Sequence, residues 1–240
     1  MIVVHDMAAQ ARKSTELAEE IQQGGGEATV CSADLSKHAE VVALADAAAS
    51  WRGGIDILVS NAGTLSGPPQ RPWLEVSEDR WDNVHQVNLM APAMLARRLI
   101  PAMVQRGFGR IICIASMSGV RPYPTEPHYA TSKAGLINLA LGISKAFAGT
   151  GVSAVTISPG PIMTPLLEGS LRQLATQNGW EGSWEEIQRR AAREAYRLTA
   201  GRIGTPDDIA RAVTFLASPS NDFITGINLR VCGGSSSETN

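Results

Sequence analysis

Short apolar runs alternate with longer segments of helical periodicity along the whole chain. The apolar runs predict strands at 2–5, 28–31, 56–59, 110–115, 153–157 and 227–231. The periodic segments predict helices at 9–23, 36–51, 77–105, 126–149, 166–177, 184–198 and 206–217. Strands that are apolar throughout, separated by helices, are typical of a parallel sheet covered on both faces. The pattern therefore predicts an α/β fold with a doubly wound, Rossmann-like parallel sheet.

The chain shows neither an internal repeat nor an interdomain linker, which predicts one domain over residues 1–240. One stretch, 164–202, departs from the regular alternation, because it is charged and helical but carries large apolar residues in loose spacing. An extra pair of amphipathic helices at the end of the sheet has this pattern, and so does a mobile lid over a substrate pocket. Trp180 and Trp184 are packing residues in the first interpretation and line an apolar pocket in the second.

Charge and composition narrow the class of partner. The 21 Lys and Arg residues and 23 Asp and Glu residues give a net charge of −2, without the basic excess of proteins that bind nucleic acid or membrane surfaces. No run reaches the roughly 18 apolar residues of a spanning helix. Cys31, Cys113 and Cys232 lie in strand-like runs without a CxxC pair, which predicts buried, inert thiols. Reduced thiols fit a cytoplasmic protein.

The stretch SMSGVRPYPTEPHYATSKAG, residues 116–135, carries the candidate chemistry. Tyr129 and Lys133 are four residues apart in a helical segment, so their side chains share one helix face. An ammonium group in that position favours the phenolate and is expected to lower the tyrosine pKa. A tyrosine tuned in this way exchanges a proton with an alcohol or carbonyl oxygen. Ser116 ends an apolar strand, where open α/β sheets bind ligands, and its hydroxyl is placed to hold the same oxygen.

Further motifs accompany this constellation in a fixed order. They are Asp34-Leu35, Asn61-Ala62-Gly63, Asn88 in HQVNLMAP, Ser116, YATSK (Tyr129 to Lys133), Pro159-Gly160-Pro161-Ile162 with Thr164, and TG-x-x-x-x-V-x-GG from Thr225 to Gly234. On these motifs the chain resembles the short-chain dehydrogenase/reductase family from Ile2 to Gly234, including members similar to 3-oxoacyl reductases. Each motif is weak singly, and their order and spacing carry the resemblance.

The resemblance implies catalytic roles for four residues. Tyr129 matches the general acid/base, and Lys133 matches the residue that lowers the tyrosine pKa and binds the nicotinamide ribose. Ser116 matches the residue that orients the substrate oxygen. Asn88 matches the helix-interrupting residue that holds a water behind the lysine. The implied reaction is hydride transfer between a nicotinamide cofactor and a secondary alcohol or ketone, and the apolar 164–200 segment hints at a medium-sized, greasy substrate.

The resemblance also implies a cofactor site. Asp34, with Leu35, is similar to the pair that meets the adenine ring, and the turn Asn61-Ala62-Gly63 is similar to the one beside the adenosine ribose. The segment with Pro159, Gly160, Ile162 and Thr164 resembles the border of the nicotinamide. By the same resemblance we expect a homo-oligomer, a dimer or a tetramer, formed through the helices near 77–105 and 126–149 and through the C-terminal strand.

Asp6 bears on the choice of cofactor. A carboxylate at the end of the second strand of such a sheet accepts hydrogen bonds from the ribose hydroxyls and repels a 2′-phosphate. Met7 follows at the place where an arginine favours NADP, so the sequence predicts NAD. The other interpretation, compatible with the first, is that Asp6 caps the helix that starts near Ala8.

The histidines have less specific interpretations. His128, beside Tyr129, is expected to line the pocket or to be exposed rather than to join the proton relay. His5, His38 and His85 lack ligand-like spacing with cysteines or carboxylates, so the sequence predicts no metal site.

The opening MIVVHDM matches a second strand of the family fold, not a first. Family members begin with a strand, a T-G-x-x-x-G-x-G loop and a helix, about thirty residues in all. We therefore expect that the first strand and its phosphate-binding loop are missing from this chain. Three explanations stay open: a sequence that starts at an internal Met of a longer protein, a short form whose sheet is completed by re-pairing or by a partner, or a member whose cofactor site has decayed.

Two functions follow from these alternatives. The first is an NAD(P)-dependent oxidoreductase with Tyr129 as general acid/base. The second is a non-catalytic scaffold or binding protein of the same fold that has lost its cofactor phosphate loop. The joint presence of Asn88, Ser116, Tyr129 and Lys133 favours the first, and the expected loss of the loop favours the second.

Overall fold

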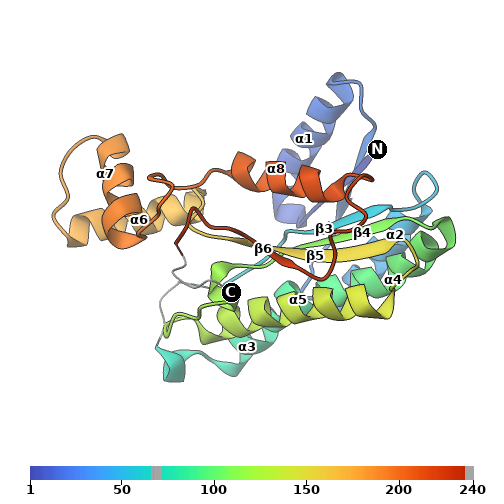
Figure 1. Ribbon diagram of the computed structural model, residues 1–240, viewed down its shortest axis with the longest axis horizontal. Coiled ribbons are helices and arrows are strands. Elements are labelled where there is room, and N and C mark those ends of the chain that lie inside the picture. Colours follow the sequence, from blue (N-terminus) through green and yellow to red (C-terminus); the bar gives the residue numbers. More distant parts are fainter. Residues whose placement is uncertain (66, 68–71, 236–240) are drawn as a thin grey trace.

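The protein contains six strands among the residues that its computed structural model describes, 1–65, 67 and 72–235 (Figure 1). These strands are β1 (Ile2–Asp6), β2 (Ala28–Ser32), β3 (Ile57–Ser60), β4 (Gly109–Ile114), β5 (Val152–Pro159) and β6 (Asn228–Val231). Each coincides with a predicted strand to within about two residues, a margin that assignment methods themselves show. The apolar runs of the sequence therefore locate the strands correctly.

The described helices also follow the sequence pattern. They are α1 (Ala11–Gln23), α2 (His38–Ser50), α3 (Glu78–His85), α4 (Ala91–Arg106), α5 (Pro127–Ala146), α6 (Pro165–Gln177), α7 (Trp184–Arg190) and α8 (Pro206–Ala217). The prediction of one helix over 77–105 is wrong in detail, because a π-helical turn, Gln86–Met90, separates α3 from α4. A second π-helical turn, Ala191–Ala195, ends the segment that begins with α7.

The strands form a parallel but divided sheet. Every ladder among the described residues is parallel: β1 pairs with β2, and β3, β4, β5 and β6 pair in that order. No ladder joins β1 to β3 in the described chain, so the strands fall into one two-stranded and one four-stranded group. The expected parallel α/β fold is confirmed. The expectation that a strand and glycine loop are missing ahead of β1 stays a prediction.

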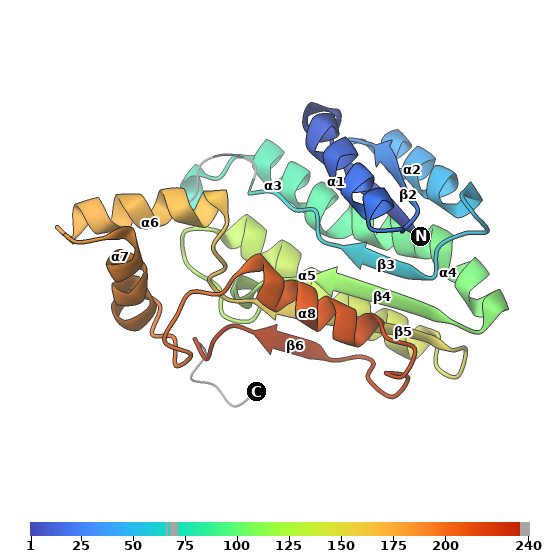
Figure 2. The same ribbon diagram turned by 90° about the horizontal axis from the view of Figure 1, so that it is seen from above.

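Helices cover both faces of the larger sheet, as Figures 1 and 2 show, with α8 on one face and α4 and α5 on the other. Side chains alternate along β4 accordingly: Ile111 and Cys113 pack with α4 and α5, whereas Ile112 and Ile114 pack with α8. All six residues of β4 are buried. Burial on both faces explains why the strand is continuously apolar after Arg110, from Ile111 to Ile114, and does not alternate with polar residues there.

The two-stranded group is attached through helices. A cluster that includes Leu35, Val41 and Leu44 packs α2 and the end of β2 against Ala91 and Leu95 of α4. In the described chain, side-chain packing in this cluster, and not strand pairing, therefore joins the β1–β2 pair to the rest of the fold.

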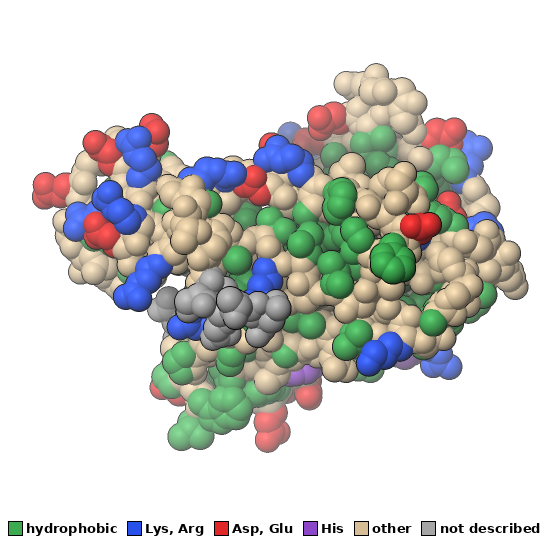
Figure 3. Space-filling view, in the orientation of Figure 1, with side chains coloured by type: hydrophobic (Ala, Val, Ile, Leu, Met, Phe, Trp, Pro, Cys, Tyr) green, Lys and Arg blue, Asp and Glu red, His purple; other side chains and the backbone are tan. Residues whose placement is uncertain are grey.

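The segment after β5 forms a projection beyond the end of the sheet, built from α6 and α7 (Figure 1). It has its own apolar cluster around Leu171 and Ala191. Trp180 and Trp184 pack against that cluster. Arg190 covers the ring of Trp180 at 5.1 Å from its centroid, and Arg172 covers the ring of Trp184 at 4.2 Å. The tryptophan pair is therefore packing. Figure 3 shows charged side chains concentrated on this projection and hydrophobic ones along the middle of the same face of the molecule.

Candidate active site

A cavity of about 890 Å³ lies at the carboxyl ends of β3, β4 and β5. Its walls come from the segment after each of these strands and from α5, α6 and α8. Nine residues that the sequence singles out line it: Asn61, Gly63, Ser116, Tyr129, Lys133, Pro159, Gly160, Ile162 and Thr164. Five others, Asp6, Asp34, Leu35, Ala62 and Asn88, are not part of the lining. The location is the one expected for a ligand site in an open parallel sheet.

Tyr129 and Lys133 share one face of α5, as their spacing predicts. The Lys133 Nζ atom lies 5.7 Å from the centroid of the Tyr129 ring, and it donates a hydrogen bond to the Ile114 carbonyl at 2.9 Å. Burial lowers the pKa of Lys133 to about 8, an effect that the nearby Cys113 opposes. At neutral pH the ammonium form of Lys133 therefore still predominates, but by a much smaller factor than for an exposed lysine.

The Tyr129 pKa differs from the sequence-based expectation. Burial raises it, a hydrogen bond with Ser116 acts in the opposite direction, and the charge of Glu126 raises it further. Lys133 does not contribute to the shift, so the expected lowering by the lysine is wrong for this structure. The protonated phenol is the favoured form, and a protonated phenol is the form that donates a proton to a carbonyl oxygen.

Ser116 connects the end of β4 to this pair. Its hydroxyl hydrogen-bonds Tyr129 and accepts a hydrogen bond from the Ser118 amide at 3.1 Å. The latter contact caps the 3₁₀ turn Met117–Gly119. The turn thus fixes the direction of the serine side chain just beyond the carboxyl end of β4.

Asn88 supports the site from behind. It lies in the π-helical turn between α3 and α4 and is buried. Its Oδ1 accepts a hydrogen bond from the Thr64 amide at 2.8 Å, and its Nδ2 donates to the Thr64 carbonyl at 3.0 Å. The same Nδ2 donates to Ser132 Oγ at 3.1 Å. The predicted helix interruption at Asn88 is confirmed, and the residue connects the segment after β3 to α5.

Gly63 and Gly160 allow close approaches that a larger residue would block. A Cβ atom at Gly63 would lie 3.3 Å from Lys133 Nζ and 3.4 Å from Asn88 Oδ1. A Cβ atom at Gly160 would lie 2.7 Å from the Cys232 Cα atom, a contact that requires the backbone to move. Both glycines therefore keep the walls of the cavity at their present spacing.

Thr164 begins α6 at the rim of the cavity. Its Oγ1 accepts a hydrogen bond from the Leu167 amide at 3.3 Å, and Pro165 follows at the first helical position. This arrangement is a standard helix start. The threonine hydroxyl therefore has a structural role as well as a place in the cavity lining.

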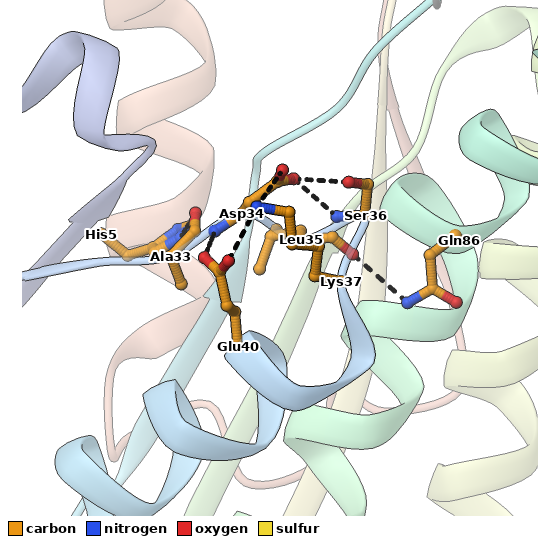
Figure 4. A network of polar contacts seen from close by, with 8 residues as sticks. All are labelled: His5, Ala33, Asp34, Leu35, Ser36, Lys37, Glu40 and Gln86. Atoms are coloured by element: carbon orange, nitrogen blue, oxygen red, sulfur yellow. Dashed lines mark hydrogen bonds and ion pairs between the residues drawn. The ribbon is translucent and has the colours of Figure 1, made fainter.

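Asp34 is engaged in a turn of its own (Figure 4). Its Oδ1 accepts hydrogen bonds from the Ser36 amide at 3.0 Å and the Ser36 hydroxyl at 2.7 Å, and its amide donates to Glu40 Oε2 at 2.7 Å. The bonds from Ser36, followed by the charge of Lys37, lower the pKa of Asp34. Leu35 is buried against α2. Their contact with an adenine ring stays a prediction.

Asp6 ends β1, and its Oδ1 accepts a hydrogen bond from the amide of the next residue, Met7, at 2.7 Å. It does not cap the helical segment that starts at Ala8: the residue before the 3₁₀ turn Ala8–Gln10 is Met7, which makes no side-chain cap, and Gln10, before α1, makes none either. The capping interpretation is therefore wrong in its usual sense, and the ribose interpretation stays a prediction.

His128 does not behave as expected. It is 1% exposed and does not line the cavity, whereas the sequence suggests a pocket-lining or exposed side chain. Its Nε2 lies 3.2 Å from the Leu65 carbonyl, and its ring packs edge-on against Trp81. Burial lowers its pKa. His128 is therefore neutral, and in that form it holds the segment after β3 in place.

The three cysteines differ in burial. Cys113 is buried, and burial raises its pKa to about 12, so the prediction of an inert thiol is confirmed there. Cys31 and Cys232 are only partly buried. Among the described residues, no group of three or more His, Cys, Asp or Glu side chains is arranged to hold a metal ion.

Several residues of the site are not evident from the sequence. Glu126, Leu65 and Thr64 line the cavity, as do residues of α8 such as Ile209 and Val213. Gly119 touches the α5 backbone, where a Cβ atom would lie 2.7 Å from the Lys133 carbonyl carbon. Only Glu126 gives a signal in the sequence, as a carboxylate three residues ahead of Tyr129. The others depend on contacts between distant segments.

Comparison with known proteins gives a consistent result. A family model described as enoyl-(acyl carrier protein) reductase matches residues 2–236. The 4-formylbenzenesulfonate dehydrogenase of Comamonas testosteroni is 37% identical over 209 residues, which are 87% of this chain and 78% of that protein. The 3β-hydroxysteroid dehydrogenase 1 of Eggerthella lenta is 33% identical over 236 residues, 98% of this chain and 84% of that protein.

Solved structures resemble the fold as a whole. L-sorbose reductase from Gluconobacter frateurii, complexed with NADPH and L-sorbose, has a TM-score of 0.86 at 28% identity and covers 99% of this chain and 87% of its own. Gluconate 5-dehydrogenase from Burkholderia cenocepacia, in complex with NADP and tartrate, has a TM-score of 0.79 at 30% identity, with coverages of 99% and 86%. In the described part of this chain, no helix has the length and apolar character needed to cross a bilayer.

Proposed function

The chain belongs to the short-chain dehydrogenase/reductase family and is an oxidoreductase, and on this premise we propose that it interconverts a secondary alcohol and a ketone. The observation that supports this reaction is the convergence of Ser116, Tyr129 and Lys133 on one cavity. Their hydroxyl, phenol and ammonium groups come from two different parts of the chain, the segment just after β4 and the helix α5. A purely structural role does not require all three at one place.

The residues present fit a nicotinamide cofactor at its reactive end. Gly63 and Lys133 both line the cavity, and the absence of a side chain at Gly63 leaves room for Lys133 Nζ and Asn88 Oδ1 against the backbone there. Lys133 and Tyr129 would hold the ribose, and Gly160, Ile162 and Thr164 would border the ring, as the resemblance implies. When bound, the cofactor supplies or accepts the hydride. The adenosine end would be held by Asp6, Asp34 and the turn at 61–63.

The protein's own residues handle the proton and the oxygen. Tyr129, whose raised pKa keeps it protonated, donates its proton to the carbonyl oxygen during reduction. Ser116 donates a hydrogen bond to the same oxygen and so orients the substrate. Asn88 holds the Thr64 backbone and thereby the far wall. We further propose that the 164–202 segment covers a medium-sized substrate, because Leu166 and Leu167 of α6 line the cavity.

Replacement of Tyr129 by Phe tests the reaction. Loss of the proton donor is expected to lower kcat/KM by about a thousandfold and to raise the dissociation constant of the cofactor by less than about tenfold, because only one hydrogen bond to the ribose is lost. Tyr196→Phe is the matched control, since Tyr196 is also partly buried but does not line the cavity. Steady-state rates and titration calorimetry with both variants measure the two quantities. A Tyr129→Phe variant that retains its rate overturns the proposed role.

Asp6→Ala tests the proposed preference for NAD. Removal of a carboxylate that repels a 2′-phosphate is expected to lower the ratio of kcat/KM with NAD to that with NADP by about tenfold. Asp82→Ala, on the exposed side of α3, is the control. The solved relatives hold NADPH or NADP, so both cofactors are needed in the assay. A ratio that does not change counts against the ribose contact.

The divided sheet supports a second candidate, a non-catalytic scaffold or binding protein. β1 and β3 belong to different sheets in the described chain, and Asp6 and Asp34 lie outside the cavity. Calorimetric titration with NADH separates the candidates: absence of binding at millimolar cofactor favours the scaffold, and binding favours the enzyme. For either candidate we propose a homo-oligomer, and light scattering that gives a monomer's mass contradicts it.

A further inference from the structure

Glu126 is an ionisable residue of the cavity to which the reaction assigns no role. It immediately precedes α5 and lines the cavity together with Ser116 and Tyr129. A carboxylate at this position of a helix commonly accepts a hydrogen bond from the first-turn amides. The Glu126 side chain makes no such bond, and no ion pair among the described residues includes it.

The charge of Glu126 acts inside the cavity. It raises the pKa of Tyr129, and its influence extends to His128. Of the described residues that line the cavity, Glu126 and Lys133 carry formal charge at neutral pH. Lys133 is 3% exposed, and its Nζ atom is bonded to the Ile114 carbonyl. Glu126 is partly exposed, so it is the charged group more accessible to a substrate.

The rest of the cavity wall strengthens this charge. The walls contributed by α6 and by α8 are largely apolar and include Leu166, Leu167 and Val213. An unpaired charge beside apolar walls interacts more strongly than one in open water, because the effective dielectric constant is lower. A second negative charge brought into the same space is therefore disfavoured.

We propose that Glu126 selects substrates by charge, accepting a neutral alcohol or ketone with a hydroxyl or amide donor beyond the reacting carbon and disfavouring carboxylates and sulfonates there. The inference rests on the proposed oxidoreductase function and adds the substrate class to it. Recognition has two parts. The carboxylate accepts a hydrogen bond from the neutral donor, and it repels an anion of the same shape.

A structural role for Glu126 has to be separated from this one. A negative charge near a helix N-terminus stabilises the helix whether or not it contacts a substrate. Glu126→Asp keeps the charge at nearly the same place, whereas Glu126→Gln keeps the length and removes the charge. A helix effect changes the stability of the protein. It therefore alters the rates with both substrates alike and leaves the ratio of the two rates unchanged.

The test compares two ketones of equal size, 4-oxocyclohexanecarboxamide and 4-oxocyclohexanecarboxylate, as substrates of the full chain at pH 7. We expect the wild type to prefer the amide in kcat/KM by at least about tenfold, and Glu126→Gln to lower that ratio by about tenfold. Glu126→Asp should keep the ratio within about threefold of wild type. Glu19→Gln, on the exposed surface of α1, controls for the change in net charge.

The outcomes are distinguishable. A lower ratio in Glu126→Gln but not in Glu126→Asp or Glu19→Gln supports the inference. An unchanged ratio in Glu126→Gln, with both ketones turned over, overturns it and leaves the proposed function intact. A wild-type chain that reduces neither ketone with NADH or NADPH overturns the proposed function for this substrate class and the inference with it.

Discussion

Lys133 shows the conflict between stability and chemistry at a single residue. Its ammonium group is almost completely buried, and burial lowers its pKa from 10.5 to about 8. A hydrogen bond to the Ile114 carbonyl compensates for part of the lost hydration. The folded protein therefore holds this charge at the expense of stability, which is common for groups that act on a substrate.

Lys133→Met is expected to reveal this cost. Between pH 8 and 10.5 the unfolded chain keeps a proton that the folded protein has lost, so this lysine's contribution to stability rises with pH. The shift corresponds to at most about 3 kcal/mol, and leaving the Ile114 carbonyl without its donor costs about 1 kcal/mol. The variant should therefore be more stable than wild type by up to about 2 kcal/mol at pH 7, and inactive.

Urea unfolding of both proteins at pH 7 and pH 9.5 measures this difference, which should shrink as the pH rises. If the difference has the same value at both pH values, the stability cost does not come from the lysine's charge.

The sequence predicts contacts within a helix better than contacts between segments. Tyr129 and Lys133 share a face because four residues make about one turn, and Ser116 joins them because strand ends meet at one edge. The bond between Asn88 and the Thr64 backbone spans 24 residues and has no periodic signal. The direction of the Tyr129 pKa shift was predicted wrongly, because spacing places the lysine but does not report burial.

At the scale of elements, the sequence locates helices well and their irregularities poorly. The 77–105 segment keeps its apolar periodicity through the π-helical turn at Gln86–Met90. The periodicity therefore does not reveal the interruption, which only the family resemblance at Asn88 indicates. The turn matters because it carries Asn88. A similar limit applies to Gly119: the sequence shows a glycine in a turn but not that the turn packs on the backbone of α5.

Gly119→Ala is expected to displace α5 and the residues that it carries. The new Cβ atom would lie 2.7 Å from the Lys133 carbonyl carbon and 2.8 Å from the Ala134 nitrogen. Relief of this overlap should lower the free energy of unfolding by about 1–3 kcal/mol and reduce kcat/KM by at least about tenfold.

The matched control is Gly142→Ala in α5, where no atom other than the adjacent backbone of the helix lies within 4 Å of the added carbon. Helix propensity predicts a gain of about 0.5–1 kcal/mol there, without loss of activity. Chemical unfolding and steady-state rates on both variants test the prediction, and equal behaviour of the two would show that the contact at Gly119 is easily relaxed.

At the scale of the whole molecule, stability is expected to be uneven. β4 and β5 each have two neighbouring strands and helices on both faces, whereas β1 pairs with β2 alone. The β1–β2 pair is joined to the rest through the packing of α2 on α4. The parallel order of the strands is predicted by the sequence pattern, but the way the two groups are attached depends on side-chain packing that a pattern does not specify.

Amide hydrogen exchange should show this difference directly. Protection in β1 and β2 is expected to be lower than in β4 and β5, because partial opening of the smaller group exposes less apolar surface. Leu44→Ala in the cluster between α2 and α4 should lower protection in β1 and β2 further, by about 2–5 kcal/mol.

Leu171→Ala, in the separate cluster of α6 and α7, is the control and should not change protection in those strands. Uniform protection across β1, β2, β4 and β5 would mean that the molecule opens as one cooperative unit.

The bond between Asn88 and residue 64 has a consequence for how the family can diversify. Asn88 contacts the amide and the carbonyl of Thr64, groups that almost any amino acid supplies. The identity of residue 64 can therefore drift under selection while the wall of the cavity stays in place. A site held through main-chain atoms tolerates amino-acid substitutions in its lining, so new substrate preferences can arise without loss of the catalytic arrangement.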